Sequence, residues 1–274
     1  MKKTILSASV AALLAASAMS AMAEDAPASP LSFNVGVTTD YLFRGVTQTH
    51  HDAALQGGVD YAFSNGFYIG AWGSTISWVK DWLGKGSTEV DLYGGYRGAF
   101  ADPDWTYDLG LITYNYPSKG SASPGNLANP NTTEVYASVG YKWISAKYSY
   151  ATSSHFVGWY APDAAGNFTR DTRGSDYLEV NANYDLGDGW GVNGHVGHQK
   201  VANFSAANYS DWKVGVTKDV GFGVIGLSYS DTSAKGDSGQ PYYWGKNGTS
   251  TTAPSGSFTN VAKGVAALSF TKTF

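Results

Sequence analysis

Charged side chains in this sequence recur at alternate positions within segments that are otherwise rich in apolar and aromatic residues. Charges spaced in this way share one face of an extended chain, because successive side chains of a strand point to opposite sides. Around a water-filled passage, rings of such charges set which ions can enter. The candidates for lining such a passage are Asp40, Arg44, Asp60, Glu89, Asp91, Arg97, Asp108, Glu134, Lys147, Glu179, Asp211, Lys213 and Lys263.

Acids outnumber bases among these candidates, eight to five, and this excess predicts weak cation selectivity. The alternative is that acids and bases pair with each other and brace the wall, which would leave it almost shut. The sequence leaves both interpretations open. Aromatic residues on the same face either fill space or offer a surface along which sugars slide; they are Tyr68, Trp72, Tyr93, Tyr114 and Tyr136.

The histidines offer a second kind of chemistry. A lipid hydrolase built on a membrane barrel uses a serine and a histidine, with a third side chain that orients the histidine. His50, His51 and His155 fall in predicted loops, but no serine motif accompanies them. His195 and His198 are three residues apart and so lie on opposite faces of a strand, which does not suit a metal site. The sequence therefore predicts no catalytic residue, no metal site and no cofactor, and an outer-membrane enzyme stays an alternative.

A sheet must position these side chains, and the sequence shows the period-two alternation of half-buried strands. No mature segment has the continuous apolar run that a membrane-spanning helix needs. The alternating segments cover residues 31–43, 53–63, 67–73, 90–96, 105–113, 135–141, 146–150, 178–184, 190–196, 212–216, 225–229 and 266–274.

Short and long connections alternate between these segments. The long connections are rich in Gly, Ser, Asn, Pro and Thr, as loops are, and they cover residues 45–52, 74–88, 117–131, 152–175, 199–209 and 231–260. Short turns at one end and long loops at the other are typical of outer-membrane barrels. We therefore predict an all-β fold, a 12-stranded antiparallel transmembrane β-barrel with short periplasmic turns and long extracellular loops, formed by residues 31–274 as a single domain.

The two faces of the predicted strands differ in charge. The apolar face carries a single charged side chain, Lys272, and a charge facing lipid costs roughly 2–4 kcal/mol at the bilayer midplane. The number of carboxylates on the other face does not suit a dry core. Aromatic residues gather near the predicted strand ends, where they would meet lipid headgroups: Phe63, Phe67, Tyr96, Trp105, Tyr141, Tyr184 and Trp190. The sequence thus favours lipid on the apolar side over a soluble barrel with the opposite orientation.

The N-terminus has the three parts of a secretory signal peptide over residues 1–23: a basic start, an apolar run and the cleavage motif Ala21-Met22-Ala23. Cleavage near Ala23 leaves 16 basic against 22 acidic residues, with a polar lead at 24–30 before the barrel. A mildly acidic chain without a basic cluster argues against nucleic acid as a partner. The lack of cysteine excludes a lipid anchor and disulfides. We expect secretion to the cell outer membrane.

Several stretches resemble the TorF-type porins of proteobacteria, a family of otherwise unknown function. The stretches are DYLFRG at 40–45, ALQGGVD at 54–60, GFYIGAWGS at 66–74, EVDLYGGY at 89–96 and TKTF at 271–274. The resemblance is sharp over the first four strands and mainly one of pattern elsewhere. It implies an outer-membrane location and a pore, and it supplies no substrate and no catalytic residue. The ending in Phe274 also resembles the signal that the barrel-assembly machinery reads, so this machinery is a predicted partner.

A barrel of twelve strands is wider than eight-stranded barrels, which side chains fill, and narrower than the open sixteen-stranded porins. We therefore predict a narrow porin for passive diffusion of small polar solutes, with outer-membrane lipid around it. A structural or adhesin barrel is a further alternative, because functional residues often lie on loops. Its binding surface would be the loops 152–175 and 231–260, which carry Trp159, Tyr160, Tyr242, Tyr243 and Trp244. The solute and the oligomeric state are not predicted.

Overall fold

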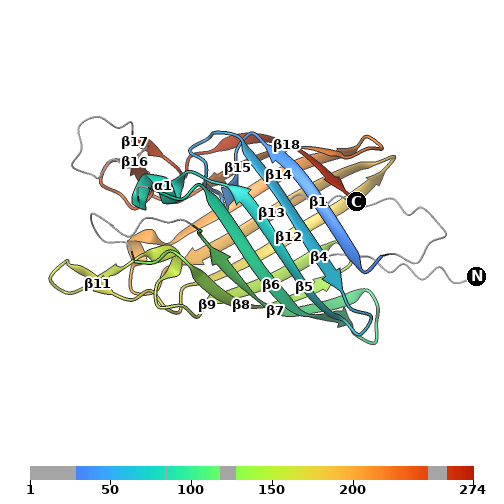
Figure 1. Ribbon diagram of the computed structural model, residues 1–274, viewed down its shortest axis with the longest axis horizontal. Coiled ribbons are helices and arrows are strands. Elements are labelled where there is room, and N and C mark those ends of the chain that lie inside the picture. Colours follow the sequence, from blue (N-terminus) through green and yellow to red (C-terminus); the bar gives the residue numbers. More distant parts are fainter. Residues whose placement is uncertain (1–28, 84, 118–127, 246–257) are drawn as a thin grey trace, which may run out of the picture.

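A closed wall of antiparallel strands is the main feature of the computed structural model (Figure 1). The structure describes residues 29–83, 85–117, 128–245 and 258–274. Every wall strand pairs with antiparallel neighbours, and β1 (Leu31–Thr38) pairs with both β4 (Ala54–Ala62) and β18 (Val265–Thr273), which closes the sheet. The other nine strands of the wall are β5 (Phe67–Thr75), β6 (Thr88–Ala99), β7 (Trp105–Asn115), β8 (Thr132–Tyr141), β9 (Ile144–Ala151), β12 (Asp176–Gly187), β13 (Trp190–Lys200), β14 (Tyr209–Asp219) and β15 (Val224–Thr232). The predicted barrel of twelve antiparallel strands is thus confirmed.

The two ends of the barrel differ in the length of their connections (Figure 1). At the turn end, short turns join neighbouring strands, and the chain enters β1 and leaves β18. At the loop end lie α1 (Trp78–Leu83), two single-turn 3₁₀ helices (Phe156–Gly158 and Ser205–Ala207) and three small hairpins. The hairpins pair β2 (Leu42–Phe43) with β3 (Val46–Thr47), β10 (Ala161–Pro162) with β11 (Phe168–Arg170), and β16 (Tyr243–Gly245) with β17 (Phe258–Asn260). No helix among the described residues is long and apolar enough to cross a membrane.

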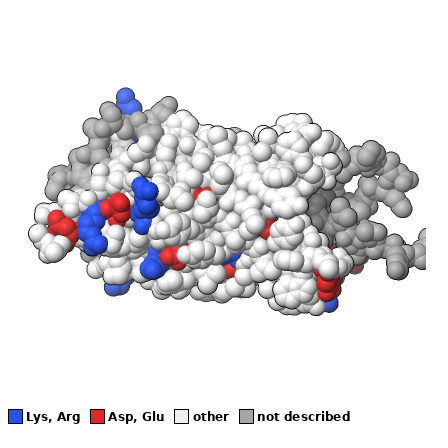
Figure 2. Space-filling view, turned by 90° about the horizontal axis from the view of Figure 1, so that it is seen from below, with Lys and Arg blue, Asp and Glu red and all other residues white. Residues whose placement is uncertain are grey.

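The outer face of the wall is apolar and exposed. Leu55, Ile69 and Val196 have exposed fractions of 57%, 56% and 56%, and each wall strand contributes at least one exposed large hydrophobic side chain. Figure 2 shows one face of the molecule on which charged side chains gather mainly towards the ends and few lie between them. The predicted aromatic residues near the strand ends are all exposed at the turn end, where Trp105 and Tyr141 pack with ring centroids 4.7 Å apart. An apolar surface of this extent is rare on soluble monomers.

The first strand is shorter than the sequence predicts. The alternating pattern runs to residue 43, but β1 ends at Thr38 and the chain then leaves the wall. Tyr41 and Phe43, predicted on the lipid side, lie inside the barrel, where Tyr41 is only 2% exposed and the Phe43 ring contacts Tyr114 at 5.4 Å. The alternation continues past the wall because the next segment is itself a hairpin with a buried side. We call residues 39–53, which include β2 and β3, the inserted hairpin.

Tyrosine rings on the inner face lie flat against glycines of neighbouring strands. The Tyr93 ring covers Gly70, and its hydroxyl donates to Asp60 at 2.6 Å. A Cβ atom at Gly70 would lie 2.4 Å from the Tyr93 ring and 2.7 Å from the Asp60 carboxylate, so any side chain there must displace both. The small residue is therefore required by close packing inside the lumen.

We expect Gly70→Ala to destabilise the barrel by about 1–3 kcal/mol, because the added methyl group overpacks this site. The unfolding temperature of the detergent-solubilised protein measures the effect. Gly194→Ala is the matched control, since the nearest atom to its added Cβ is 4.0 Å away. Equal unfolding temperatures for the two variants would contradict the packing described here.

Candidate pore lumen

Side chains that face the lumen fall into two zones along the barrel. Towards the turn end the charged side chains are only partly buried, and they define a vestibule lined by Asp60, Arg97, Asp108, Lys147 and Lys213. Towards the loop end they are almost fully buried, and this second zone, the plug, is where the inserted hairpin lies. The deeply buried wall carboxylates there are Glu89, Asp91, Glu134 and Asp211, with exposed fractions of 2%, 0%, 1% and 4%. The lumen is thus accessible from the turn end and filled at the loop end.

The inserted hairpin crosses the lumen from β1 and β4 to the opposite wall. At its tip the Arg44 guanidinium donates to Glu134 of β8 and to Gln199 of β13, both at 2.7 Å. It also stacks over the Tyr177 ring of β12 at 4.3 Å, and the Tyr209 hydroxyl of β14 donates to the Arg44 carbonyl at 2.9 Å. Strands β8 to β14 lie across the barrel from β1 in the order of pairing. One residue therefore ties the hairpin to four strands of the far wall.

The tip fits against the far wall with no spare room. Gly45 has a φ of +78°, a left-handed conformation that favours glycine. A Cβ atom at this position would lie 2.5 Å from the methyl group of Thr232 and 2.9 Å from Cβ of Asp211. The backbone at the tip therefore touches the wall directly, which closes the space between hairpin and wall on this side.

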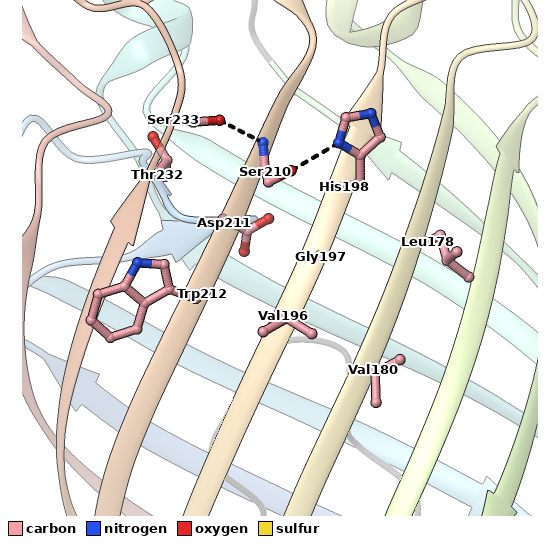
Figure 3. Close-up of a pocket in the computed structure, with 10 residues that line it drawn as sticks. All are labelled: Leu178, Val180, Val196, Gly197, His198, Ser210, Asp211, Trp212, Thr232 and Ser233. Atoms are coloured by element: carbon pink, nitrogen blue, oxygen red, sulfur yellow. Dashed lines mark hydrogen bonds between the residues drawn. The ribbon is translucent and has the colours of Figure 1, made fainter.

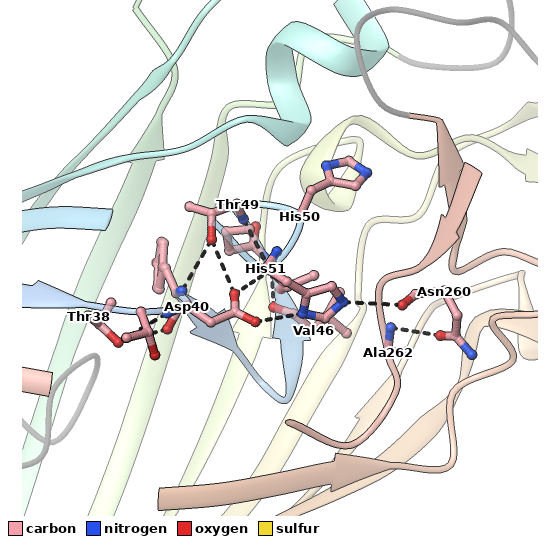
Figure 4. A network of polar contacts seen from close by, with 12 residues as sticks. Thr38, Asp40, Val46, Thr49, His50, His51, Asn260 and Ala262 are labelled. Carbon is pink, nitrogen blue, oxygen red and sulfur yellow. Dashed lines mark hydrogen bonds and ion pairs between the residues drawn. The ribbon is translucent and has the colours of Figure 1, made fainter. Parts of the chain in front are cut away.

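The base of the hairpin is held by two buried carboxylates, and Figure 4 shows the contacts of one of them, Asp40. Asp40 accepts hydrogen bonds from Thr47 and Thr49, and its second oxygen lies 2.7 Å from Nδ1 of His51. The Tyr41 hydroxyl donates to Glu89 of β6 at 2.7 Å. These contacts fix the turn of the chain from the wall into the lumen.

Aromatic residues of several loops cover the hairpin at the loop end. Trp78 of α1 packs against Tyr116 and Trp244, with ring centroids 4.9 and 6.3 Å apart. The backbone N–H of Thr47 donates to the carbonyl of Val261 at 2.9 Å, so the last loop bonds directly to β3. Trp244 is only 6% exposed, and Trp159 and Tyr242 are similarly buried. These three aromatic side chains, candidates for an adhesin surface, instead form the cover of the plug.

Several vestibule charges are paired along the wall. Lys147 of β9 contacts Glu179 of β12 at 2.7 Å, and Tyr68 of β5 donates to Asp108 of β7 at 2.7 Å. The Arg97 guanidinium lies 5.0 Å from the Tyr68 ring centroid. One pair of an acid and a base, Lys147 with Glu179, therefore braces the wall as the alternative interpretation predicts, while the other contacts of these charges are to Tyr68.

Ten of the thirteen predicted lining residues lie on the inner face of wall strands, and three do not. Asp40 and Arg44 sit on the inserted hairpin, because β1 ends before them. Lys263 lies exposed in the turn that precedes β18, so it does not line the wall. Sequence reasoning missed Gln199, which it assigned to a loop; the residue continues the inward parity of His195 and Gly197 on β13 and is 1% exposed.

The loop histidines serve as anchors of the hairpin. His50 uses Nδ1 for both neighbours, with Ser77 at 3.2 Å and Asp81 of α1 at 2.7 Å, and its buried Nε2 has no partner. A hydrolytic relay needs serine and carboxylate on different ring nitrogens, so this arrangement is not one. His51 turns towards Asp40, so the two neighbouring histidines have different partners. Both residues have positive φ values.

The third loop histidine, His155, lies against a ring outside the wall. Its imidazole and the ring of Tyr160 have centroids 4.3 Å apart. Burial lowers the pKa of His155 below its ordinary value, because a charged imidazole is less well solvated there. The neutral ring is therefore a packing group in this loop.

A surface hollow lies on the outside of the wall and not in the lumen (Figure 3). Leu178, Val196 and Trp212 line it, and each is an exposed member of the apolar outer face. His198 and Ser210, at its upper edge in the view, are joined by a 2.9 Å hydrogen bond. Because it belongs to the outer face, this hollow is not a candidate for a solute site in the lumen.

The chain thus forms a closed twelve-stranded β-barrel with an apolar exterior. Its interior is polar and is filled at one end. The chain belongs to a family described as "Bacterial protein of unknown function (Gcw_chp)", whose model matches residues 22–263. The resemblance to porins of the TorF type is confirmed only as far as this membership, and that narrower name stays a prediction. No curated protein sequence matches the chain.

Solved structures with a similar outline are porins. The chain is similar to the KdgM porin in complex with disordered oligogalacturonate, with 8% sequence identity and a TM-score of 0.47 over 89% of this chain and 98% of that one. It is also similar to the NanC porin, with 12% identity and a TM-score of 0.47 over 89% and 97% of the two chains.

Proposed function

We propose that this protein lies in the bacterial outer membrane and lets small polar solutes and ions diffuse passively through its barrel. The observation that carries the proposal is the opposite character of the two faces of one closed wall. Exposed apolar side chains cover the outside, while charged and hydroxyl groups face inwards. A closed barrel satisfies all its backbone hydrogen bonds within the wall, which is what a segment in lipid requires.

The orientation follows from the asymmetry of the ends. Short turns of outer-membrane barrels face the periplasm and long loops face outwards. The vestibule would then open to the periplasm, and the plug would face the outside of the cell. The signal peptide that would direct export, with cleavage near Ala23, lies outside the described residues and stays part of the proposal.

Passage is limited by the inserted hairpin. Its tip touches the far wall at Gly45, and its base is bonded to β6 through Tyr41 and Glu89. Solutes must therefore pass beside the hairpin or wait for it to move. A low conductance with brief openings is the expected behaviour, since lid and loop motions occur on microsecond to millisecond timescales.

We further propose that ion preference arises in the plug. The vestibule has no excess of acid, because Asp60 and Asp108 face the three bases Arg97, Lys147 and Lys213. The buried Glu179 beside the vestibule is paired with Lys147. The plug has an excess of acid, since its wall carboxylates are opposed by Arg44 at the hairpin tip and by the partly exposed His195 at its edge. Excess negative charge in a buried passage favours cations.

Planar-bilayer recording of the purified chain tests this function. We expect small conductance steps and a reversal potential, in a KCl gradient, that indicates modest cation preference. No steps at all, together with no swelling of liposomes in sugar solution, would contradict a channel.

The alternative to a channel is a structural or adhesin barrel. One observation favours it: the hairpin is bonded to four strands of the far wall and fills the loop end. Such a barrel passes no solute, so the absence of liposome swelling separates the two functions. An outer-membrane lipid hydrolase would be revealed by release of fatty acid from lipid vesicles.

Neutralising the plug is expected to remove cation preference. In the double variant Glu89→Gln/Asp91→Asn, the reversal potential should move most of the way to zero, because two buried acidic groups are lost. Asp237→Asn is the control, since Asp237 is an exposed carboxylate in a loop. An unchanged reversal potential in the double variant would place selectivity elsewhere.

A further inference from the structure

Asp91 is a buried carboxylate for which the wall provides no partner. It lies on β6 with an exposed fraction of 0%, and among the described residues it alone has both carboxylate oxygens buried without a hydrogen bond. An unpaired carboxylate in a dry environment is strongly unfavourable unless a cation or a proton neutralises it. The plug must therefore supply one or the other.

The neighbours of Asp91 are aromatic on both sides. Its cross-strand partners are Trp72 on β5 and Tyr114 on β7, and both side chains are buried with it. The Tyr114 hydroxyl is directed to Glu134 at 3.2 Å, and the Trp72 ring packs edge-on with Tyr41 at 5.5 Å. Neither ring donates a hydrogen bond to Asp91, yet the faces of Trp and Tyr rings attract cations.

The charges around Asp91 add to its need for a cation. Glu89 precedes it by two residues on the same face, and both Glu89 and Glu134 interact with it electrostatically. Arg44 is bonded to one oxygen of Glu134, while the other oxygen, Oε1, is buried without a partner. The guanidinium of Arg44 thus contacts only one of these three carboxylates, and His51 is already paired with Asp40.

We propose that the plug holds a small monovalent cation, an alkali metal ion or ammonium, bound by the carboxylate of Asp91 and balanced by the charges of Glu89 and Glu134. Among the described residues no three histidine or acidic side chains converge to hold a metal ion, so Asp91 is the one carboxylate ligand of this site. The bound cation offsets the excess acid of the plug and so stabilises the inserted hairpin. Binding of this kind does not depend on conduction.

The test is the unfolding temperature of the full chain in detergent, with chloride salts of different cations at one ionic strength. Sodium, potassium or ammonium should raise this temperature by several degrees in a saturable way relative to N-methyl-D-glucamine, because a ligand that binds only the folded state stabilises it. Asp91→Asn should lose this dependence on the cation, whatever its absolute stability. Asp237→Asn, the exposed control, should keep it.

A second measurement uses only the wild-type protein, so it does not depend on whether the variant folds. The relaxation of ²³Na in the presence of the wild-type protein should be enhanced, and added potassium should reverse the enhancement. Equal unfolding temperatures in all salts, with no sodium relaxation effect, would show that a proton neutralises Asp91 and would overturn the proposal. Stabilisation by calcium alone would overturn the monovalent assignment.

Discussion

Replacing residues 40–52 with a short glycine-rich turn is expected to raise single-channel conductance several-fold. Thr38 of β1 already pairs with Ala54 of β4, so the wall register does not need the inserted hairpin. Without it, the tip contact at Gly45 and the bonds of Arg44 disappear, and the loop end of the lumen loses its filling. Bilayer recording of the variant beside the wild-type chain measures the change.

A matched control is the shortening of another loop-end hairpin. Residues 163–167 join β10 to β11, and this hairpin extends away from the barrel (Figure 1). Its shortening should leave conductance unchanged. Equal conductance for the variant without the inserted hairpin and the wild type, with both folded, would mean that the hairpin is not the constriction.

Breaking the ion pair between Arg44 and Glu134 is expected to give the largest loss of stability of any single substitution discussed. The two side chains are only 6% and 1% exposed and their charged atoms are 2.7 Å apart. Removing one partner of such a buried pair costs about 3–5 kcal/mol, because the other is left as an uncompensated charge. Glu134→Gln should therefore lower the unfolding temperature sharply and increase the frequency of channel openings, as the hairpin tip loses its main anchor.

The double variant Arg44→Met/Glu134→Gln distinguishes the effect of losing the ion pair from the effect of leaving one buried charge without its partner. Because neither charge remains, most of the stability lost in each single variant should return, while the openings should stay frequent. Losses that simply add in the double variant would show that the two residues do not act as a pair.

The wall was predictable because its signal is local. Lipid on one side and polar groups on the other impose period two, so that Leu55 and Ile69 point outwards while Asp60 and Tyr68 point inwards. Turn chemistry at the turn end, such as Asn65-Gly66, marks where strands reverse. These features determine strand number and facing without any knowledge of distant contacts.

The plug was not predictable from the same signal. Tyr41 and Phe43 keep the alternation of β1, so nothing local indicates that the chain leaves the wall at Thr38. The insertion depends on partners far away in sequence, since Arg44 meets Glu134 and Gln199 only after the barrel has closed. The positive φ values at Arg44 and Gly45 belong to this tertiary arrangement.

The two interpretations of the charged face both describe part of the structure. Lys147 and Glu179 form an ion pair, as the bracing alternative predicts. Around Glu89 and Asp91 acidic side chains outnumber basic ones. The proposed cation preference depends on this excess of acid. The count of charges in the sequence could not separate these regions, because it contains no information on which acid meets which base.

The most direct test of the account is the labelling of two neighbouring positions in reconstituted protein. The chain contains no cysteine, so Ser138→Cys and Val139→Cys each introduce a unique thiol. Ser138 faces the lumen beside Lys147, while Val139 is an exposed member of the apolar exterior. In liposomes, a charged, water-soluble maleimide should label the cysteine at position 138 and leave the one at 139 unmodified. Labelling at position 139 with protection at position 138 would mean that the two faces of the wall are reversed. That result would contradict a barrel with lipid outside and water within.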